Sequence, residues 1–290
     1  MRIALNTLND MCLNVEQWGD GPTRIIALHG FTGKASTWES FSRAAGDKYT
    51  IICPELPGHG KSDAPGLPEL YDMEYTLQAL AEMADKLEIQ KAHWLGYSMG
   101  GRIAVAAALS LSDRMLSLTV ESGSAGLPTD TERKARVRRD TALANTIERN
   151  GMEAFVDYWE SLPLWESQSR LPAAVQEKLR AERLANNPGG LANSLRGIGL
   201  GAQPYLLDRL AEINVPSLFI AGQDDVKFSA TARQIHETVP ESRLCIVPES
   251  GHAVHLEQPD LFNRTVLDFI RTVDGSTDTP QDQTRSRMSR

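Results

Sequence analysis

The chain has 290 residues, of which 41% are hydrophobic and 23% are charged. This balance is typical of a folded globular protein of one or two domains and excludes disorder as the main state. The 30 Lys and Arg residues are outnumbered by 38 Asp and Glu residues, so the formal net charge is −8. Because a protein that follows nucleic-acid phosphates carries a positive surface, this charge argues against a nucleic-acid partner.

The cysteines and the apolar stretches indicate the compartment. Cys12, Cys53 and Cys245 are odd in number and far apart, which predicts neither a disulfide framework nor a zinc site and fits a reducing environment. Asn and Asp residues interrupt the first 14 residues before a signal-peptide core can form. No apolar stretch approaches the roughly 18 residues of a membrane span. We therefore expect a cytoplasmic protein without a membrane span.

Short runs of apolar and β-branched residues predict strands, and helical patterns lie between them. The expected strands cover residues 12–15, 25–28, 49–53, 92–95, 116–120, 217–220 and 244–247. Apolar residues at helical spacing predict helices over 73–87 and 100–109, a third from about Ser229 and a last one over 259–270. Continuous apolar strands that alternate with helices indicate a mostly parallel central sheet with helices on both faces. The predicted fold class is therefore α/β.

Residues 127–203 break this alternation, because they contain helical sequence and no convincing strand. We interpret them as a helical cap inserted into a core formed by residues 1–126 and 204–274. The insertion carries a net charge of +1, whereas the rest of the chain carries −9, as expected if the insertion helps to hold an anion. Residues 275–290 are polar and lack aromatic residues, which predicts a disordered tail.

The strongest chemical signal is the run Gly96-Tyr97-Ser98-Met99-Gly100. It directly follows the predicted strand 92–95 and opens the predicted helix 100–109, which is the context of a G-x-S-x-G nucleophile elbow. Such a turn places the Ser98 hydroxyl in strained backbone geometry at a helix N-terminus, with glycines that let neighbouring chains approach. The bare pattern also fits a simple helix N-cap serine. The other catalytic groups must therefore support the interpretation.

An acid and a base follow the elbow in the required order of serine, acid and histidine. Asp225 ends a run that follows a predicted strand, and Asp224 is an alternative acid. His252 follows the next strand after a flexible glycine, and His255 is an alternative base. In an open parallel sheet these loops lie at the same carboxyl edge as Ser98.

The loop LHGFTG at 28–33 supplies a further expected element. The main-chain N–H groups of Phe31 and Met99 are expected to point at a developing oxyanion. The loop 54–60, which contains His59, is interpreted as architectural. Neither His59 nor His93 has partners at metal-ligand spacing, so no metal is expected.

Together, LHGF, PGHG, GYSMGG, the acid loop and the late Gly-His resemble the α/β-hydrolase superfamily over nearly the whole chain. The chain is similar to one family within it, the 2-succinyl-6-hydroxy-2,4-cyclohexadiene-1-carboxylate synthases (MenH) of menaquinone biosynthesis. This similarity spans about 28–270 and rests on GYSMGGR, ESGSAGL at 121–127, the Arg-rich stretch around Arg136, YWESLPL at 158–164, NPGGLANSLRGIGLGAQP at 187–204 and GQDDVKF at 222–228.

The resemblance implies a lyase that eliminates pyruvate from 2-succinyl-5-enolpyruvyl-6-hydroxy-3-cyclohexene-1-carboxylate without an organic cofactor or metal. It implies that Ser98, paired with His252, removes a ring proton, while Asp225 holds the imidazole tautomer. The N–H groups of Phe31 and Met99 would stabilise negative charge on a substrate oxygen.

The implied small-molecule substrate carries several carboxylates, which guanidinium groups bind through paired hydrogen bonds. The family's binding residues fall on Tyr97, Arg102, Arg136, Trp159 and Arg183. Five of the seven residues at 133–139 are basic, and most must form a solvated helix face. Helical spacing allows Arg133, Arg136 and Asp140 to share one face, with Lys134 and Arg138 on another. Trp159 also fits a purely structural role in the cap core.

Two other functions fit parts of the sequence. A hydrolase of esters or carbon–carbon bonds would use Ser98 as a covalent nucleophile, but a neutral ester would not need the cap arginines. A non-catalytic ligand receptor of the same fold predicts a broken triad, whereas all three members are present here. The sequence is compatible with a monomer or a small homo-oligomer.

Overall fold

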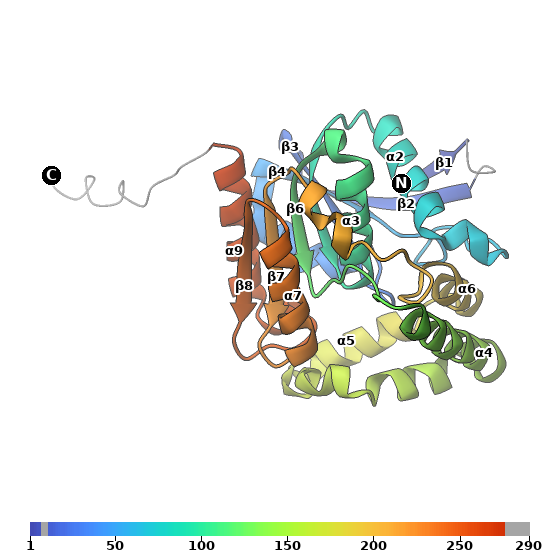
Figure 1. The fold of residues 1–290 in the computed structure, drawn as a ribbon. Helices are drawn as coiled ribbons and strands as arrows, with labels where there is room; N and C mark the ends of the chain where they lie inside the picture. Colours follow the sequence, from blue (N-terminus) through green and yellow to red (C-terminus); the bar gives the residue numbers. More distant parts are fainter. Residues whose placement is uncertain (7–10, 276–290) are drawn as a thin grey trace, which may run out of the picture.

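The computed structural model describes residues 1–6 and 11–275, which contain one eight-stranded sheet (Figure 1). The strand order is β1-β2-β4-β3-β5-β6-β7-β8. The strands are β1 (Arg2–Leu5), β2 (Met11–Trp18), β3 (Thr23–Leu28), β4 (Tyr49–Pro54), β5 (Ala92–Tyr97), β6 (Met115–Glu121), β7 (Ser217–Gly222) and β8 (Ser242–Val247).

All seven expected strands are confirmed, and the sheet is mostly parallel as predicted. Strand β1 pairs with β2, and β2 with β4, in antiparallel fashion, while every pair from β4 to β8 is parallel. The central strand β5 is buried along its whole length, which explains its mainly apolar sequence. Strand β1 was not expected, because a four-residue strand leaves too short a pattern to recognise.

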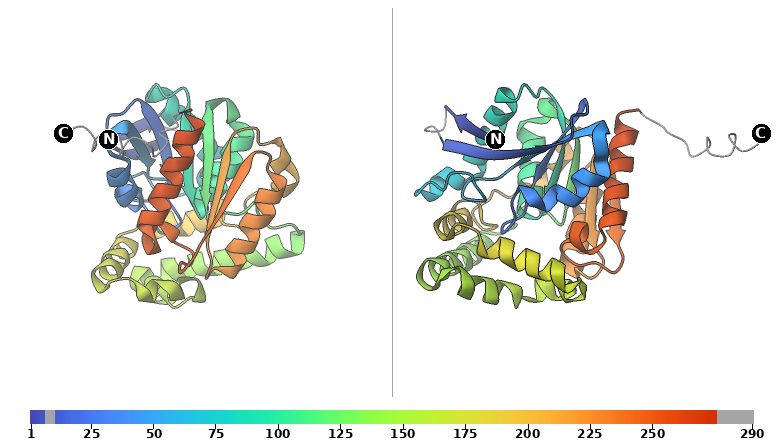
Figure 2. Two further views of the ribbon diagram at one scale, coloured as in Figure 1. Left: turned by 90° about the vertical axis from the view of Figure 1, so that its left-hand side faces the viewer. Right: turned by 180° about the vertical axis from the view of Figure 1, so that it is seen from behind.

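Helices cover both faces of the sheet (Figures 1 and 2). Buried residues of α2, α3 and α7 form one core cluster with the sheet, and those of α1, α8 and α9 belong to a second cluster. These helices are α1 (Glu39–Ala45), α2 (Met73–Lys86), α3 (Met99–Ser110), α7 (Val226–Thr238), α8 (Val254–Glu257) and α9 (Pro259–Val273). Short 3-10 turns are η1 (Ala35–Trp38), η2 (Gly46–Lys48), η3 (Pro68–Tyr71), η4 (Ser112–Arg114) and η6 (Leu207–Glu212).

The segment between β6 and β7 contains only helices: α4 (Asp130–Glu160), η5 (Pro163–Arg170), α5 (Ala173–Leu184) and α6 (Pro188–Ile198). Helix α4 begins with a capping box between Thr129 and Glu132, which satisfies N–H groups that the first turn leaves free. Gly151, at φ 80°, interrupts α4. The helices gather along one side of the sheet, beyond the strand ends (Figure 1).

The last two expected features are the helix near Ser229 and the C-terminal tail. Helix α7 begins at Val226, three residues before the expected Ser229, because the Asp225 side chain accepts a hydrogen bond from the Phe228 N–H and caps the helix. Apart from Gly275, the predicted tail at 275–290 lies outside the described residues. Within the described ranges, no helix combines the length and apolarity that crossing a membrane requires.

Candidate active site

Ser98 occupies a sharp turn between β5 and α3. Its backbone has φ 51° and ψ −105°, a left-handed conformation that costs energy for a residue with a side chain. Flanking chains approach so closely that a Cβ atom on Gly96 would lie 2.3 Å from the Gly100 oxygen, and one on Gly100 2.3 Å from the Leu28 oxygen. The predicted need for glycine at both positions is therefore confirmed by sterics.

A continuous series of hydrogen bonds joins three expected residues. His252 Nε2 lies 2.9 Å from Ser98 Oγ, and His252 Nδ1 lies 2.7 Å from Asp225 Oδ2. His252 and Asp225 are almost fully buried, so water does not compete for their contact. With Nδ1–H donating to the carboxylate, Nε2 is left free to accept the Ser98 proton. This arrangement suits proton transfer to or from the serine oxygen.

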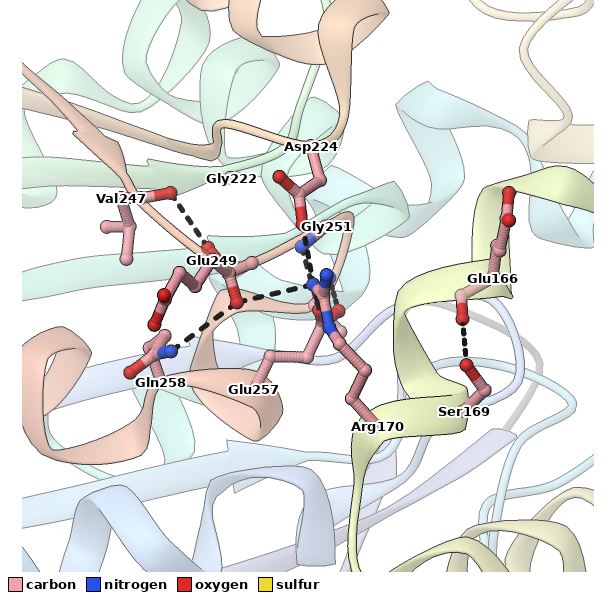
Figure 3. A network of polar contacts seen from close by, with 12 residues as sticks. Glu166, Ser169, Arg170, Gly222, Asp224, Val247, Glu249, Gly251, Glu257 and Gln258 are labelled. Atoms are coloured by element: carbon pink, nitrogen blue, oxygen red, sulfur yellow. Dashed lines mark hydrogen bonds and ion pairs between the residues drawn. The ribbon is translucent and has the colours of Figure 1, made fainter.

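The two alternative residues point elsewhere. Asp224 pairs with Arg170 of η5 at 2.6 Å, and Arg170 also donates to the main-chain oxygen of Glu249 (Figure 3). His255 donates through Nδ1 to Glu121, at 2.9 Å. The structure therefore brings Asp225 and His252, rather than Asp224 and His255, to Ser98.

The main-chain N–H groups of Phe31 and Met99 lie in the loop after β3 and at the first position of α3. Within the described part of the chain, neither group donates to another residue. His59, from the loop interpreted as architectural, contacts the Phe31 oxygen through Nε2 at 2.7 Å and the Pro57 oxygen through Nδ1 at 2.9 Å. Burial lowers the pKa of His59, and the contacts with the two carbonyl oxygens act in the opposite direction. The ring thereby braces the Phe31 loop.

A cavity of about 860 Å³ opens above Ser98 and His252. The sheet edge forms one side of it, and the helical segment between β6 and β7 forms the other. Seven Lys or Arg side chains and only two Glu side chains line it: Arg43, Arg102, Arg136, Arg139, Lys178, Arg183, Lys227, Glu39 and Glu182. A cavity with this excess of cations suits a ligand with several negative charges.

Arg102 and Arg136 face this cavity from different elements. Arg102, in α3, donates to the main-chain oxygen of Ile198 and to the side chain of Gln203, and it makes no ion pair with a carboxylate of the described residues. Burial, and then the positive charge of Arg136, lower the pKa of Arg102 to about 9. Arg136, in α4, donates through Nε to Asp140 at 2.8 Å. That bond leaves the Nη atoms of Arg136 for a ligand.

Arg183, Trp159 and Tyr97 also line the cavity. Arg183 is buried and donates to Glu160 and Gln168, but its Nε–H has no partner among the described residues. The Trp159 ring packs against Phe31, with ring centroids 5.4 Å apart. Trp159 therefore belongs both to the core of the helical segment and to the cavity wall. Tyr97 packs beside His252, with ring centroids 5.6 Å apart.

The basic stretch at the start of α4 divides differently from the expectation. Arg133 bonds to Asp130 and to the Leu127 oxygen, and it lines a separate surface groove with Lys134 and Arg138. Arg139 lies beside Arg136 on the cavity instead. Sequence reasoning missed Arg139, although its spacing of three residues from Arg136 places both on one helix face.

The fold and the site define the class of this protein. Residues 23–259 match the family model described as the alpha/beta hydrolase fold, so the chain belongs to the α/β hydrolases. A thermophilic esterase from Thermogutta terrifontis, solved with malate bound, has the same fold at a TM-score of 0.83 and 26% identity, with 94% of this chain and 98% of the esterase chain covered.

Within that class, the chain belongs to the 2-succinyl-6-hydroxy-2,4-cyclohexadiene-1-carboxylate synthase family. It is 43% identical over 249 residues to a Bacillus subtilis protein provisionally given that name, covering 86% of this chain and 90% of the relative. The Pectobacterium atrosepticum synthase is 31% identical, with 85% and 93% covered. The structure of MenH from S. aureus matches at a TM-score of 0.86 and 32% identity, over 90% of this chain and 98% of that chain.

Proposed function

We propose that this protein is a lyase that eliminates pyruvate from 2-succinyl-5-enolpyruvyl-6-hydroxy-3-cyclohexene-1-carboxylate and yields 2-succinyl-6-hydroxy-2,4-cyclohexadiene-1-carboxylate. Its family membership supports this reaction. The observation that carries the proposal is the opening of the Ser98–His252–Asp225 series onto a cavity dominated by cationic side chains. A substrate with several carboxylates needs such a cavity, and its acidic ring proton needs a base.

In the proposed reaction, Ser98 Oγ takes a proton from the substrate ring while its own proton passes to His252 Nε2. The electrons of the broken C–H bond form a new ring double bond, the existing ring double bond shifts by one position, and the C–O bond to the enolpyruvyl group breaks. The leaving enolate takes up a proton on its methylene carbon and becomes pyruvate, and His252 gives up the proton that it accepted from Ser98, so that both side chains return to their starting state. Asp225 stabilises the imidazolium form of His252. The N–H groups of Phe31 and Met99 stabilise negative charge on a substrate oxygen.

The helical residues 127–203 act as a cap in this proposal. Arg136, Arg183 and Trp159 come from the cap, whereas Tyr97 and Arg102 come from the core formed by 1–126 and 204–274. Substrate carboxylates would bridge the two parts through the arginines, and the Trp159 ring would cover the carbocycle. Chemistry would therefore reside in the core, and recognition would be shared with the cap.

The decisive experiment supplies purified protein with freshly generated substrate and follows pyruvate release together with diene absorbance. Ser98→Ala should abolish catalysed release, and Arg136→Ala should raise KM. Arg138→Ala is the matched control, because Arg138 lies two residues away on α4 but lines a different groove. Release no faster than the uncatalysed background would refute the lyase.

A second candidate function is hydrolysis of an acidic ester. The 26% identical, malate-bound esterase from Thermogutta terrifontis favours it, because a Ser-His-Asp series also serves covalent hydrolysis. Turnover of p-nitrophenyl esters without pyruvate release would support this candidate over the lyase.

A further inference from the structure

A second carboxylate–histidine pair lies beneath the candidate active site. Glu121 ends β6, next to the strand that carries Ser98, and its side chain is 0% exposed. Its carboxylate accepts from His255 Nδ1 at 2.9 Å and from the His255 main-chain N–H at 3.0 Å. A buried carboxylate is costly unless it is paired, so both bonds must form for the fold to tolerate Glu121.

This pair links the two segments that must meet for proton transfer. The Glu121 main-chain oxygen accepts from the Ser98 N–H at 2.8 Å, so Glu121 holds the nucleophile turn. The Glu121 side chain holds His255, which is three residues after His252. One residue therefore fixes both ends of the hydrogen bond between Ser98 and His252.

Aromatic rings fill the space between the two histidines. The His255 ring lies 4.6 Å from Tyr97 and 5.3 Å from Trp38, and Tyr97 in turn lies 5.6 Å from His252. Burial, and then the negative charge of Glu121, raise the pKa of Tyr97. A displacement of His255 is thus transmitted through Tyr97 as well as through the backbone.

We infer that Glu121 and His255 are positioning residues that hold the His252 loop at hydrogen-bond distance from Ser98. His255 also lines the cavity, but the inferred role requires no exchange of protons with the substrate. His255, which the sequence offered as an alternative base, is thereby assigned a positioning role through its bond to Glu121. The kinetic part of the test rests on the proposed lyase function, whereas the crystallographic part does not.

The test compares Glu121→Ala with Glu121→Gln by kinetics and by crystal structures. We expect Glu121→Ala to lower kcat by about tenfold or more, since small displacements of reacting groups carry penalties of this order, and to leave KM within about twofold because the arginines are untouched. The Ser98 Oγ to His252 Nε2 distance should exceed hydrogen-bond range. Glu121→Gln should retain kcat within about threefold. The amide oxygen of Gln can still accept from the His255 main-chain N–H, and the His255 ring can adopt the tautomer that hydrogen-bonds to the amide.

His93→Ala is the matched control. His93 is equally buried in the same sheet and pairs with Ser117 at 2.7 Å and with Asp274 at 3.1 Å, but it lies near the start of β5, away from Ser98. The His93→Ala variant should have a lower Tm and an unchanged kcat. If Glu121→Ala does not fold, Glu121→Met keeps the side-chain volume and is tested in its place.

Two results would overturn the inference: an unchanged kcat in the folded variant, or a Ser98–His252 distance still near 2.9 Å. If the wild type releases no pyruvate but Glu121→Ala separates Ser98 from His252, the proposed function fails and the positioning role stands.

Discussion

Asp140 binds Arg136 one helical turn away, at 2.8 Å, with the Asp140 side chain 6% exposed and the Arg136 side chain 37% exposed. The buried partner thus orients a cation that reaches the cavity. Substituting Asp140→Asn removes the ion pair while keeping the side-chain shape. We expect KM to rise by about three- to tenfold with little change in kcat, because a binding contact is weakened rather than a catalytic one. Steady-state kinetics measure this, and an unchanged KM would contradict the proposed role of Arg136.

The lowered pKa of Arg102 predicts a pH limit for substrate binding. Its guanidinium must be protonated to bind a carboxylate, and the protonated form predominates below the pKa of about 9. The cation is therefore present at pH 7, and KM should rise as pH increases through 9. In Arg102→Gln, KM should be higher at pH 7 and should lose this rise. A wild-type KM that stays flat to pH 10 would argue against the lowered pKa, whereas an unchanged KM in Arg102→Gln at pH 7 would argue against Arg102 as a carboxylate ligand.

Asp225 and Asp224 are adjacent but make different contacts, so they form a matched pair. Asp225→Asn replaces the acceptor for His252 Nδ1 and favours the wrong imidazole tautomer, which should lower kcat by about 10³- to 10⁴-fold. Asp224→Asn weakens a surface contact with Arg170 and should leave kcat nearly unchanged. Equal losses in the two variants would mean that the hydrogen bond to Asp225 is not what matters.

His29 predicts how stability responds to acid. Its ring is fully buried, accepts the Leu56 N–H through Nε2 at 3.0 Å, and contacts the Gly30 oxygen through Nδ1 at 2.8 Å. Burial lowers its pKa in the folded protein to about 3. Between pH 6.5 and 3 the unfolded chain binds a proton that the folded chain does not, so folding stability falls as pH falls.

Each pH unit within that window should cost about 1.4 kcal/mol of the free energy of unfolding from this group. Urea unfolding of the wild type and of His29→Asn at pH 7 and pH 5 measures the contribution. His29→Asn should show a smaller pH dependence than the wild type. A pH dependence that stays as large in His29→Asn as in the wild type would argue against burial of His29 as the cause.

Much of the sheet was predictable because β4, β5 and β7 are buried along their whole length and therefore have mainly apolar sequences. The start of α7 was not predicted correctly. Asp225 caps this helix and also contacts His252, and the sequence pattern had indicated only the second of these roles. The short β1 and α1 also fell below the length at which periodicity is informative.

Some site residues were predictable from the sequence and others were not. Ser98, Asp225 and His252 sit in turns whose glycines and order are recognisable. Arg136 could not be separated by pattern from its basic neighbours, since the choice depends on how α4 is rotated against the sheet. Glu121 could have been found from one signal: it is the only charged residue of β6 and ends that strand at the carboxyl edge of the sheet.

The helical segment leaves the sheet at β6 and returns at β7, and these two strands are neighbours. It is therefore a single insertion between two neighbouring strands, and replacing it would leave every strand pairing intact. Evolution can exchange such an insertion as one unit, so related proteins can bind new ligands while they keep the same sheet and the same turn at Ser98.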